Sequence, residues 1–225
     1  MALIFNDTFS VSASALLEDH VPDTGSSWTK AFDNTACIAR VSVTACTVAR
    51  SGGETAKSVG YTTAPSPTVN TYDIQMKFDA VYVPGTGTRT VHLFGRWSSS
   101  TDAGYAAQAT NGNSASIGQR IIKNVSGVNT ILASNSVSTS ASDVMLFSIV
   151  SATKTMSING ASVLQTSDDT ITATGQAGLG WGNLYGSGNI VTNWQIDNFS
   201  VTETDGAPAA VIPSPVMQAG FSGPI

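Results

Sequence analysis

The sequence predicts an all-β protein, an antiparallel sandwich of two sheets, and three observations lead to that prediction. In the predicted strand 72–83, residues 72–80 alternate strictly between apolar and polar side chains, which is typical of a strand with one buried and one solvated face. Asn159-Gly160 lies between two apolar-polar runs, the strongest short-range signal for a β-hairpin. Glycine or paired polar residues interrupt the chain about every 8 to 12 residues, as in sandwiches. We therefore expect helix to be nearly absent.

The first and last apolar runs predict two strands that lie side by side and close the structure. In residues 3–11, Leu3, Phe5, Phe9 and Val11 share one parity. In residues 192–203 the apolar parity shifts by one at Asp197-Asn198, which is typical of a β-bulge that bends a strand. The apolar positions are Leu3, Phe5, Phe9 and Val11 in the first run, and Trp194, Ile196, Phe199 and Val201 in the last.

The segment after the first strand contains a turn and then a strand-forming stretch. Pro22-Asp-Thr-Gly25 has proline to preset φ and glycine for the left-handed position, and we expect Trp28 to cap one end of the core. Residues 36–50 are rich in β-branched side chains and predict one or two strands. Cys37 and Cys46 lie in this stretch; we expect two reduced, buried thiols, with a disulfide as the less favoured alternative.

The middle of the chain predicts a series of further strands. Residues 90–97 place Val91, Leu93 and Trp97 on one side and His92, Phe94 and Arg96 on the other. Residues 105–110 follow as a strand. Residues 117–125 and 128–134 flank Ser126-Gly127, which predicts a second tight hairpin.

The last twenty residues differ from the rest. Half of the eight prolines lie there, and from Gly206 onward there is no charged residue. Proline excludes a central strand or a long helix, while the apolar content is unlike that of a solvated linker. We therefore divide the chain into a sandwich, residues 1–205, and an extended arm, residues 206–225. The arm either folds back on its own domain or, as we favour, docks on a partner through Val211, Ile212, Pro213, Pro215, Val216, Met217, Phe221 and Ile225.

Composition and charge exclude several classes of partner. Charged residues make up 11% of the chain, the net charge is −5 and the ten Lys and Arg residues are scattered, so no basic surface for nucleic acid is expected. No apolar run approaches the length of about 18 residues that spans a bilayer. The first residues, Met1-Ala-Leu-Ile-Phe5, lack the basic region and long apolar core of a secretory signal, which favours synthesis and folding in a cytoplasm.

Four groups of residues together resemble a known family. They are Phe5-Asn-Asp-Thr-Phe9, Leu17-Glu-Asp-His20 with the following turn and Trp28, Asp169-Thr-Ile-Thr-Ala-Thr-Gly-Gln-Ala-Gly-Leu179, and Asp197-Asn-Phe-Ser-Val201. In their order and spacing the chain resembles the concanavalin A-like lectin and glucanase sandwich, in the form found in bacteriophage structural proteins. The resemblance covers about residues 5–203 and implies a jelly roll whose first and last strands pair. It leaves function open, because the fold carries lectins, hydrolases, lyases and structural modules.

Catalytic and metal-binding patterns are weak. Glutamate occurs only at positions 18, 54 and 203, so the paired carboxylates that glycoside hydrolysis needs are not arranged along one strand. His20 and His92 are the only histidines, and we expect structural roles for both. Asp102, Asn111 and Asn113 could offer oxygen atoms to calcium, but a self-capped polar loop is the favoured interpretation. We expect no enzyme activity, no metal and no cofactor.

A carbohydrate site is the alternative that the aromatic residues near predicted loops suggest. Sugar binding would use aromatic faces with amides and carboxylates beside them. The candidate residues are Trp97, Asp102, Tyr105, Asn111, Trp181 and Tyr185, whereas we assign Trp28 and Trp194 to the core.

The leading prediction is a structural protein of a bacteriophage virion, a capsid decoration, cement or head-fibre protein held by residues 206–225. It rests on the resemblance, the low charge and the apolar arm. The alternative is a carbohydrate-binding receptor-recognition module of a phage tail, and a glycan hydrolase or lyase ranks last. The expected partners are other virion proteins, a possible glycan and further copies of the chain in a homo-oligomer, with a trimer preferred.

Overall fold

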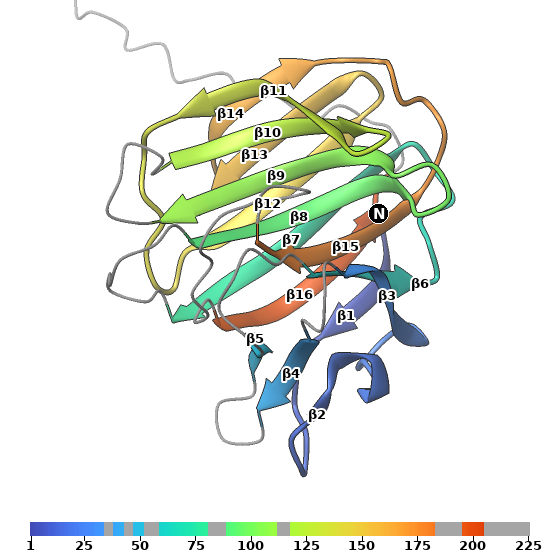
Figure 1. Cartoon of the computed structure of the whole chain (residues 1–225), viewed down its shortest axis with the longest axis vertical. Helices are drawn as coiled ribbons and strands as arrows, with labels where there is room; N and C mark the ends of the chain where they lie inside the picture. Colours follow the sequence, from blue (N-terminus) through green and yellow to red (C-terminus); the bar gives the residue numbers. More distant parts are fainter. Residues whose placement is uncertain are drawn as a thin grey trace, which may run out of the picture.

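The chain folds into two antiparallel sheets packed face to face, as the computed structural model in Figure 1 shows. The structure describes residues 1–33, 38–42, 47–51, 59–80, 89–111, 118–182 and 195–204. Within these residues the only helical element is one 3-10 turn, η1 (Leu17–Asp19). The predicted all-β sandwich is therefore confirmed.

The first sheet has nine strands among the described residues. Eight follow one another across it: β14 (Ala161–Ser167), β13 (Thr153–Ile158), β12 (Val144–Val150), β7 (Thr71–Ala80), β16 (Gln195–Glu203), β5 (Thr47–Ser51), β4 (Ile38–Ser42) and β2 (Ala15–Leu16). The ninth, β1 (Ala2–Asp7), pairs with β16. This pairing confirms the prediction that the first and last strands close the structure.

The second sheet has seven strands in the described part of the chain. Their order is β11 (Val128–Asn135), β10 (Gly118–Val125), β9 (Ala103–Asn111), β8 (Arg89–Ser98), β15 (Gln176–Trp181), β6 (Val59–Ala64) and β3 (Ser27–Asp33). The main core lies between the sheets. Strand β7 shows why: Tyr72, Ile74, Met76 and Phe78 are fully buried, and the alternation of the strand points all four to one side.

Both predicted tight hairpins are confirmed. Ser126 and Gly127 have φ of 51° and 79°, and Asn159 and Gly160 have φ of 51° and 80°. Two consecutive positive φ angles define the type I′ turn, whose twist matches that of the strands it joins. The predicted bulge in the last strand is also present, since the register of β16 against β7 shifts between Asp197 and Ser200, and Asn198 has φ of 50°.

Strand β8 departs from the predicted alternation. Arg96 has φ of 51°, and the register against β9 shifts between Gly95 and Ser98. This bulge reverses the parity of the following residue, so Trp97 contacts Phe94 and Ala106 instead of the face that carries Val91 and Leu93. The prediction that Trp97 shares the side of Val91 and Leu93 is wrong because alternation does not continue through a bulge.

Several predictions fall on residues that the structure does not describe. Cys37, Cys46, Asn113, Tyr185 and Trp194 lie outside the described residues, as does the whole arm with Val211, Ile212, Pro213, Pro215, Val216, Met217, Phe221 and Ile225. The last described residue is Thr204, whose backbone N–H donates to the carbonyl of Thr71 at 3.0 Å.

Candidate functional site: a polar pocket beside Arg96

The bulge in β8 directs a buried guanidinium toward one end of the sandwich. Arg96 is 3% exposed, and its backbone N–H donates to the hydroxyl of Tyr72 at 2.5 Å. Gly175 lies directly against the backbone of Arg96: a Cβ at position 175 would come within 2.5 Å of the carbonyl carbon of Arg96. A glycine is therefore required for the chain that enters β15 to pass the bulge.

The guanidinium of Arg96 joins three chain segments that are far apart in the sequence. Its Nη1 donates to the carbonyl of Ile171 at 2.7 Å, and its Nη2 donates to the carbonyls of Asn70 and Ser151, both at 2.9 Å. These carbonyls belong to the entry of β7, the β12–β13 turn and the segment after β14. Charge-assisted hydrogen bonds of this kind hold the three segments in one rigid arrangement.

A second buried cation, Lys154, lies beside them at the start of β13. Its ammonium donates to the carbonyls of Ser151 at 3.1 Å, Ala152 at 2.9 Å and Asp168, and it stands 4.2 Å from the centre of the Tyr105 ring. Burial lowers the pKa of Lys154 to about 8, and the nearby charge of Arg96 adds to this effect. The carbonyls and the ring face therefore replace the water that an ammonium would otherwise need.

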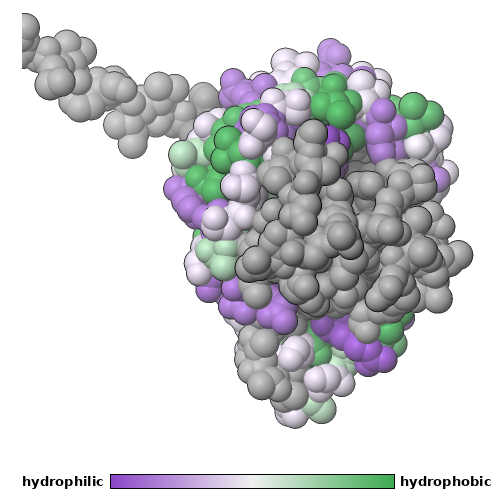
Figure 2. Space-filling view, turned by 60° about the vertical axis from the view of Figure 1, so that its left-hand side comes forward, coloured by the Kyte–Doolittle hydropathy of each residue, from purple (hydrophilic) through white to green (hydrophobic). Residues whose placement is uncertain are grey.

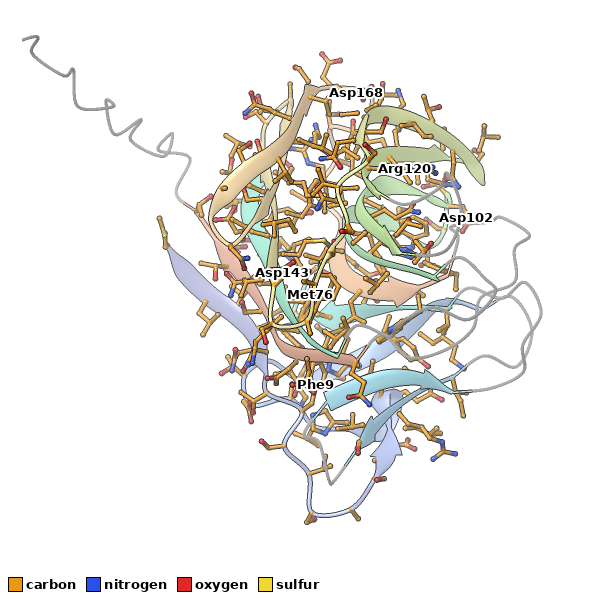
Figure 3. All side chains as sticks on the ribbon, turned by 90° about the vertical axis from the view of Figure 1, so that its left-hand side faces the viewer. Phe9, Met76, Asp102, Arg120, Asp143 and Asp168 are labelled. Carbon is orange, nitrogen blue, oxygen red and sulfur yellow. The ribbon has the colours of Figure 1, made fainter. Side chains whose placement is uncertain are left out.

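Asp168 supplies the negative charge of this cluster (Figure 3, top). Its carboxylate accepts from Lys123 Nζ at 2.7 Å, from the Tyr105 hydroxyl at 2.6 Å and from the N–H of Thr170 at 3.0 Å. Burial pushes its pKa upward, but these donors together outweigh burial and hold the pKa well below its usual range. Burial, and then the bond to Asp168, raises the pKa of Tyr105 to about 12.

A pocket of about 290 Å³ opens at this end of the sandwich. Its lining is Asn70, Arg96, Ser151, Ala152, Asp169 and Thr172. The guanidinium forms part of its buried wall, while Asn70, Ser151, Asp169 and Thr172 are exposed around it. The pocket thus combines a cation, a carboxylate, an amide and two hydroxyls, which are groups able to donate to and accept from a polar ligand.

Of the residues predicted as a carbohydrate site from the sequence, none that the structure describes lines this pocket. Trp97, Tyr105 and Trp181 are 1%, 0% and 2% exposed, so none offers a ring face to a ligand. This corrects the expectation that they flank an open surface, because a ring next to a loop in sequence can still point into the core. Asp102 is half-buried beside the β10–β11 turn, the side chain of Asn111 at the end of β9 is not described, and Tyr185 lies outside the described residues.

Trp97 instead belongs to an aromatic cluster on the other face of the second sheet. The ring of Phe94 lies 5.4 Å from that of Trp97, and Phe32 lies 5.3 Å from Trp97 and 5.9 Å from Phe94. Gly178 makes room for this packing, because a Cβ there would meet the ring of Phe94 at 2.6 Å. The cluster is a second, smaller core.

Both histidines are buried, in agreement with the structural roles expected for them. His20 is 7% exposed and its Nε2 forms a hydrogen bond with Asp7 Oδ1 at 2.8 Å. His92 is fully buried, and burial lowers its pKa to about 3, so its ring is neutral at physiological pH. Neither histidine lines the pocket.

Sequence reasoning missed Arg96, Lys154 and Asp168 as members of one site. They stand on or beside three different strands, and only the register of the sheets brings them together. One signal was available. Charged residues are scarce in this chain, and a charged side chain in a strand that becomes buried almost always has a partner. Among the described residues no group of three or more His, Cys, Asp or Glu side chains forms a metal site, and no described helix is long and apolar enough to cross a membrane.

Comparisons with known proteins agree with this architecture. No family model and no curated protein matches the chain. Among solved structures, the carbohydrate-binding module CBM66 from Bacillus subtilis is similar with a TM-score of 0.55 and 11% identity, over 79% of this chain and 95% of that one. The exoplasmic/lumenal domain of VIP36 in a Ca²⁺- and Man2-bound form has a TM-score of 0.60 and 10% identity, over 88% and 90% of the two chains. The β-glucanase of Bacillus licheniformis has a TM-score of 0.58 and 9% identity, over 91% and 99%.

The chain therefore has the concanavalin A-like jelly-roll fold of lectins and glucanases, as the sequence resemblance implied. At sequence identities this low, the structural similarity is evidence for the fold alone. Because the same fold carries sugar-binding proteins and a hydrolase, the activity has to be argued from the site.

Proposed function

We propose that this protein is a non-catalytic carbohydrate-binding module and that its sugar-binding site is the pocket beside Arg96. The observation that carries the proposal is the lining of that pocket: a carboxylate, an amide, two hydroxyls and a buried guanidinium around about 290 Å³. Sugar hydroxyls are both donors and acceptors, and they match a set of this kind. The lectin-like fold supports the same proposal.

The rigidity of the pocket is the second support. Arg96 holds the carbonyls of Asn70, Ser151 and Ile171, and Lys154 holds those of Ser151 and Ala152. The backbone of three lining residues, Asn70, Ser151 and Ala152, is therefore fixed before a ligand arrives, which reduces the entropy that binding costs.

The carboxylates support binding over hydrolysis. Hydrolysis by a carboxylate pair needs two such groups about 5 to 9.5 Å apart across the scissile bond, whereas the pocket lining contains the single carboxylate of Asp169. Asp168 is held by Lys123 and Tyr105. Glu18 lies 3.6 Å from Lys30, and Glu203 accepts from the N–H and hydroxyl of Thr68.

The test is an array of mono- and oligosaccharides, followed by calorimetry on the best ligand with two matched variants. Asp169→Asn keeps the shape of the side chain and removes its charge, so the affinity should fall about tenfold or more, since a hydrogen bond to a charged group contributes about 1.5 to 3 kcal/mol. Asp19→Asn changes an exposed aspartate on η1, outside the pocket, and should bind like the parent. Equal affinities for all three proteins would contradict the proposed site.

A structural role in a bacteriophage particle, with the protein made in the host cytoplasm, is our second proposal. Its support is the charge-free, proline-rich sequence of residues 206–225 together with the family resemblance. Deleting residues 206–225 should then release the protein from the particle, while retention of the shortened chain would argue against this role.

A further inference from the structure

The outer edge of the second sheet is unusual in having no charge. Strand β11 is the outermost strand of that sheet among the described residues, and residues 124–142 contain no Asp, Glu, Lys or Arg. Val128 and Ile131 on this strand are 67% and 53% exposed. Natural proteins normally protect an exposed edge with charges or proline, because its backbone groups can pair with another strand.

The neighbouring edge of the first sheet has the same character. Strand β14 is the outermost strand there, it contacts β11, and residues 155–167 contain no charged residue. The two strands lie together at the top of Figure 1, and hydrophobic residues reach the surface at that height in Figure 2. One side of the sandwich therefore consists of two neighbouring edge strands that carry no charged side chains.

The hairpin geometry shows which backbone N–H and carbonyl groups of β11 point away from β10 and could pair with another strand. Val125 and Val128 flank the two-residue turn and pair with each other, so they exchange backbone hydrogen bonds within the hairpin. By alternation, Ile131, which stands opposite Ile122, directs its N–H and carbonyl away from β10. An added strand could pair there.

Residues 209–218 have the composition that such an edge would accept. They carry no charge, and their only prolines are Pro213 and Pro215, both at odd positions. In an extended strand the backbone groups of even and odd residues point to opposite sides. The even residues therefore keep every N–H for pairing, and the prolines fall on the outer side, where they would prevent a further strand from adding.

We propose that residues 209–218 of one copy add as an outer strand to β11 of a second copy. The added strand would cover Val128 and Ile131 with its own apolar side chains, and its prolines would end the sheet.

The span required within a single chain is the reason for assigning the arm to a second copy. Four strand spacings separate β16 from β14 in the first sheet, which is about 19 Å, and β11 lies in the other sheet. The five residue steps from Thr204 to residue 209 span at most about 18 Å when fully extended. They are too short to bring residue 209 to β11 of the same chain.

Each copy then offers one arm and one edge. A head-to-tail contact of this kind satisfies every copy only when it closes into a ring, which fits the homo-oligomer expected from the sequence.

Equilibrium sedimentation of the full chain at increasing concentration tests the proposal, with a pair of edge variants. Ile131→Lys places a charge on the edge, whereas Leu3→Lys places the same charge on β1 at a residue that is also 53% exposed. We expect the parent and Leu3→Lys to assemble alike, and Ile131→Lys to dissociate at concentrations at least about tenfold higher. A parent that stays monomeric throughout, or an Ile131→Lys variant that assembles like Leu3→Lys, would overturn the proposal.

Two neighbouring alanines of the arm provide a sharper comparison. Ala210→Pro removes an N–H on the pairing side, while Ala209→Pro removes one on the outer side. Assembly should weaken more for Ala210→Pro, and equal behaviour of the two variants would contradict the proposed pairing.

Discussion

Asp7 is a fully buried carboxylate that fixes three parts of the N-terminal region. Its Oδ1 accepts from the N–H of Phe9 at 2.7 Å and bonds to His20 at 2.8 Å, and its Oδ2 accepts from Trp28 Nε1 at 2.6 Å. Phe9 has φ of 52°, so the bond to its N–H stabilises a backbone conformation that side chains other than glycine rarely adopt.

Asp7→Asn should therefore destabilise the protein. The amide would turn one acceptor into a donor facing another donor, and the expected loss is about 2 to 4 kcal/mol in the free energy of unfolding, measured with urea. Asp23→Asn is the matched control, because Asp23 accepts two bonds from Thr8 at an exposed site, and its loss should stay below about 1 kcal/mol. An Asp7→Asn variant as stable as the parent would contradict this role.

Asp168 should make the free energy of unfolding depend on pH in the acid range. Its folded-state pKa lies below its usual value, so the folded protein binds this proton less readily than the unfolded chain. The stabilisation is complete above the unfolded pKa, near 3.8, and is lost as the pH falls toward the folded pKa.

Urea unfolding of the parent and Asp168→Asn between pH 7 and pH 2 measures this effect. The parent should be more stable by about 1 to 2 kcal/mol at neutral pH, since solvent screens a partly exposed pair, and the difference should shrink below about pH 4. Asp169→Asn is the matched control at pH 7: Thr170, Lys123 and Tyr105 bond to Asp168 instead, so this variant should stay within about 0.5 kcal/mol of the parent. A difference that is constant with pH would refute the assignment.

At the scale of single elements, the pocket depends on how β15 approaches the bulge in β8. Gly175→Ala would place a Cβ within 2.5 Å of the backbone of Arg96, so the two segments must separate. We expect a loss of about 1 to 3 kcal/mol in stability together with weaker sugar binding. Gly160→Ala, in the β13–β14 turn, strains a φ of 80° without meeting any atom within 4 Å, and it should lower stability while leaving binding unchanged. If both variants lost sugar binding, the loss could not be assigned to the β8 bulge, and the claim that the bulge positions the pocket would be contradicted.

The elements also show what local sequence can predict. The alternation in the strand predicted over 72–83 and the turn dipeptides at 126–127 and 159–160 act over a few neighbouring residues. Both hairpins are confirmed, and the strand is confirmed as far as Ala80, the last of its residues that the structure describes. The position of Trp97 could not be predicted in this way. The bulge at Arg96 depends on Gly175 and Tyr72, which are distant in sequence, so the local pattern gave no warning of the change in parity.

For the whole molecule, the closure of the sandwich was predictable and the site was not. The first and last strands could be paired because both carry a strong apolar parity, and Phe5 and Val201 are indeed partners. The site requires Arg96, Lys154 and Asp168 to meet, and that depends on the order of strands in two sheets. The candidate aromatic residues Trp97, Tyr105 and Trp181 lie near loops in the sequence, but their rings are buried in the two apolar clusters, which form from strands distant in the sequence.

Assembly through the arm would give the pocket an additional function at this scale. A ring of copies presents several pockets at once, and linked sites bind a repeated glycan with greater avidity than one site alone. The two proposals are independent, since the pocket and the β11 edge share no residue.

The most direct test of the pocket is a titration of the ¹H–¹⁵N spectrum of the full chain with the best sugar from the array. We expect the shifts to concentrate at residues 70, 151–152 and 169–172 and to include the Nε–H of Arg96, a buried group with no hydrogen-bond partner in the described structure. Shifts confined to the cluster of Phe32, Phe94 and Trp97, or the absence of shifts with any sugar, would contradict it.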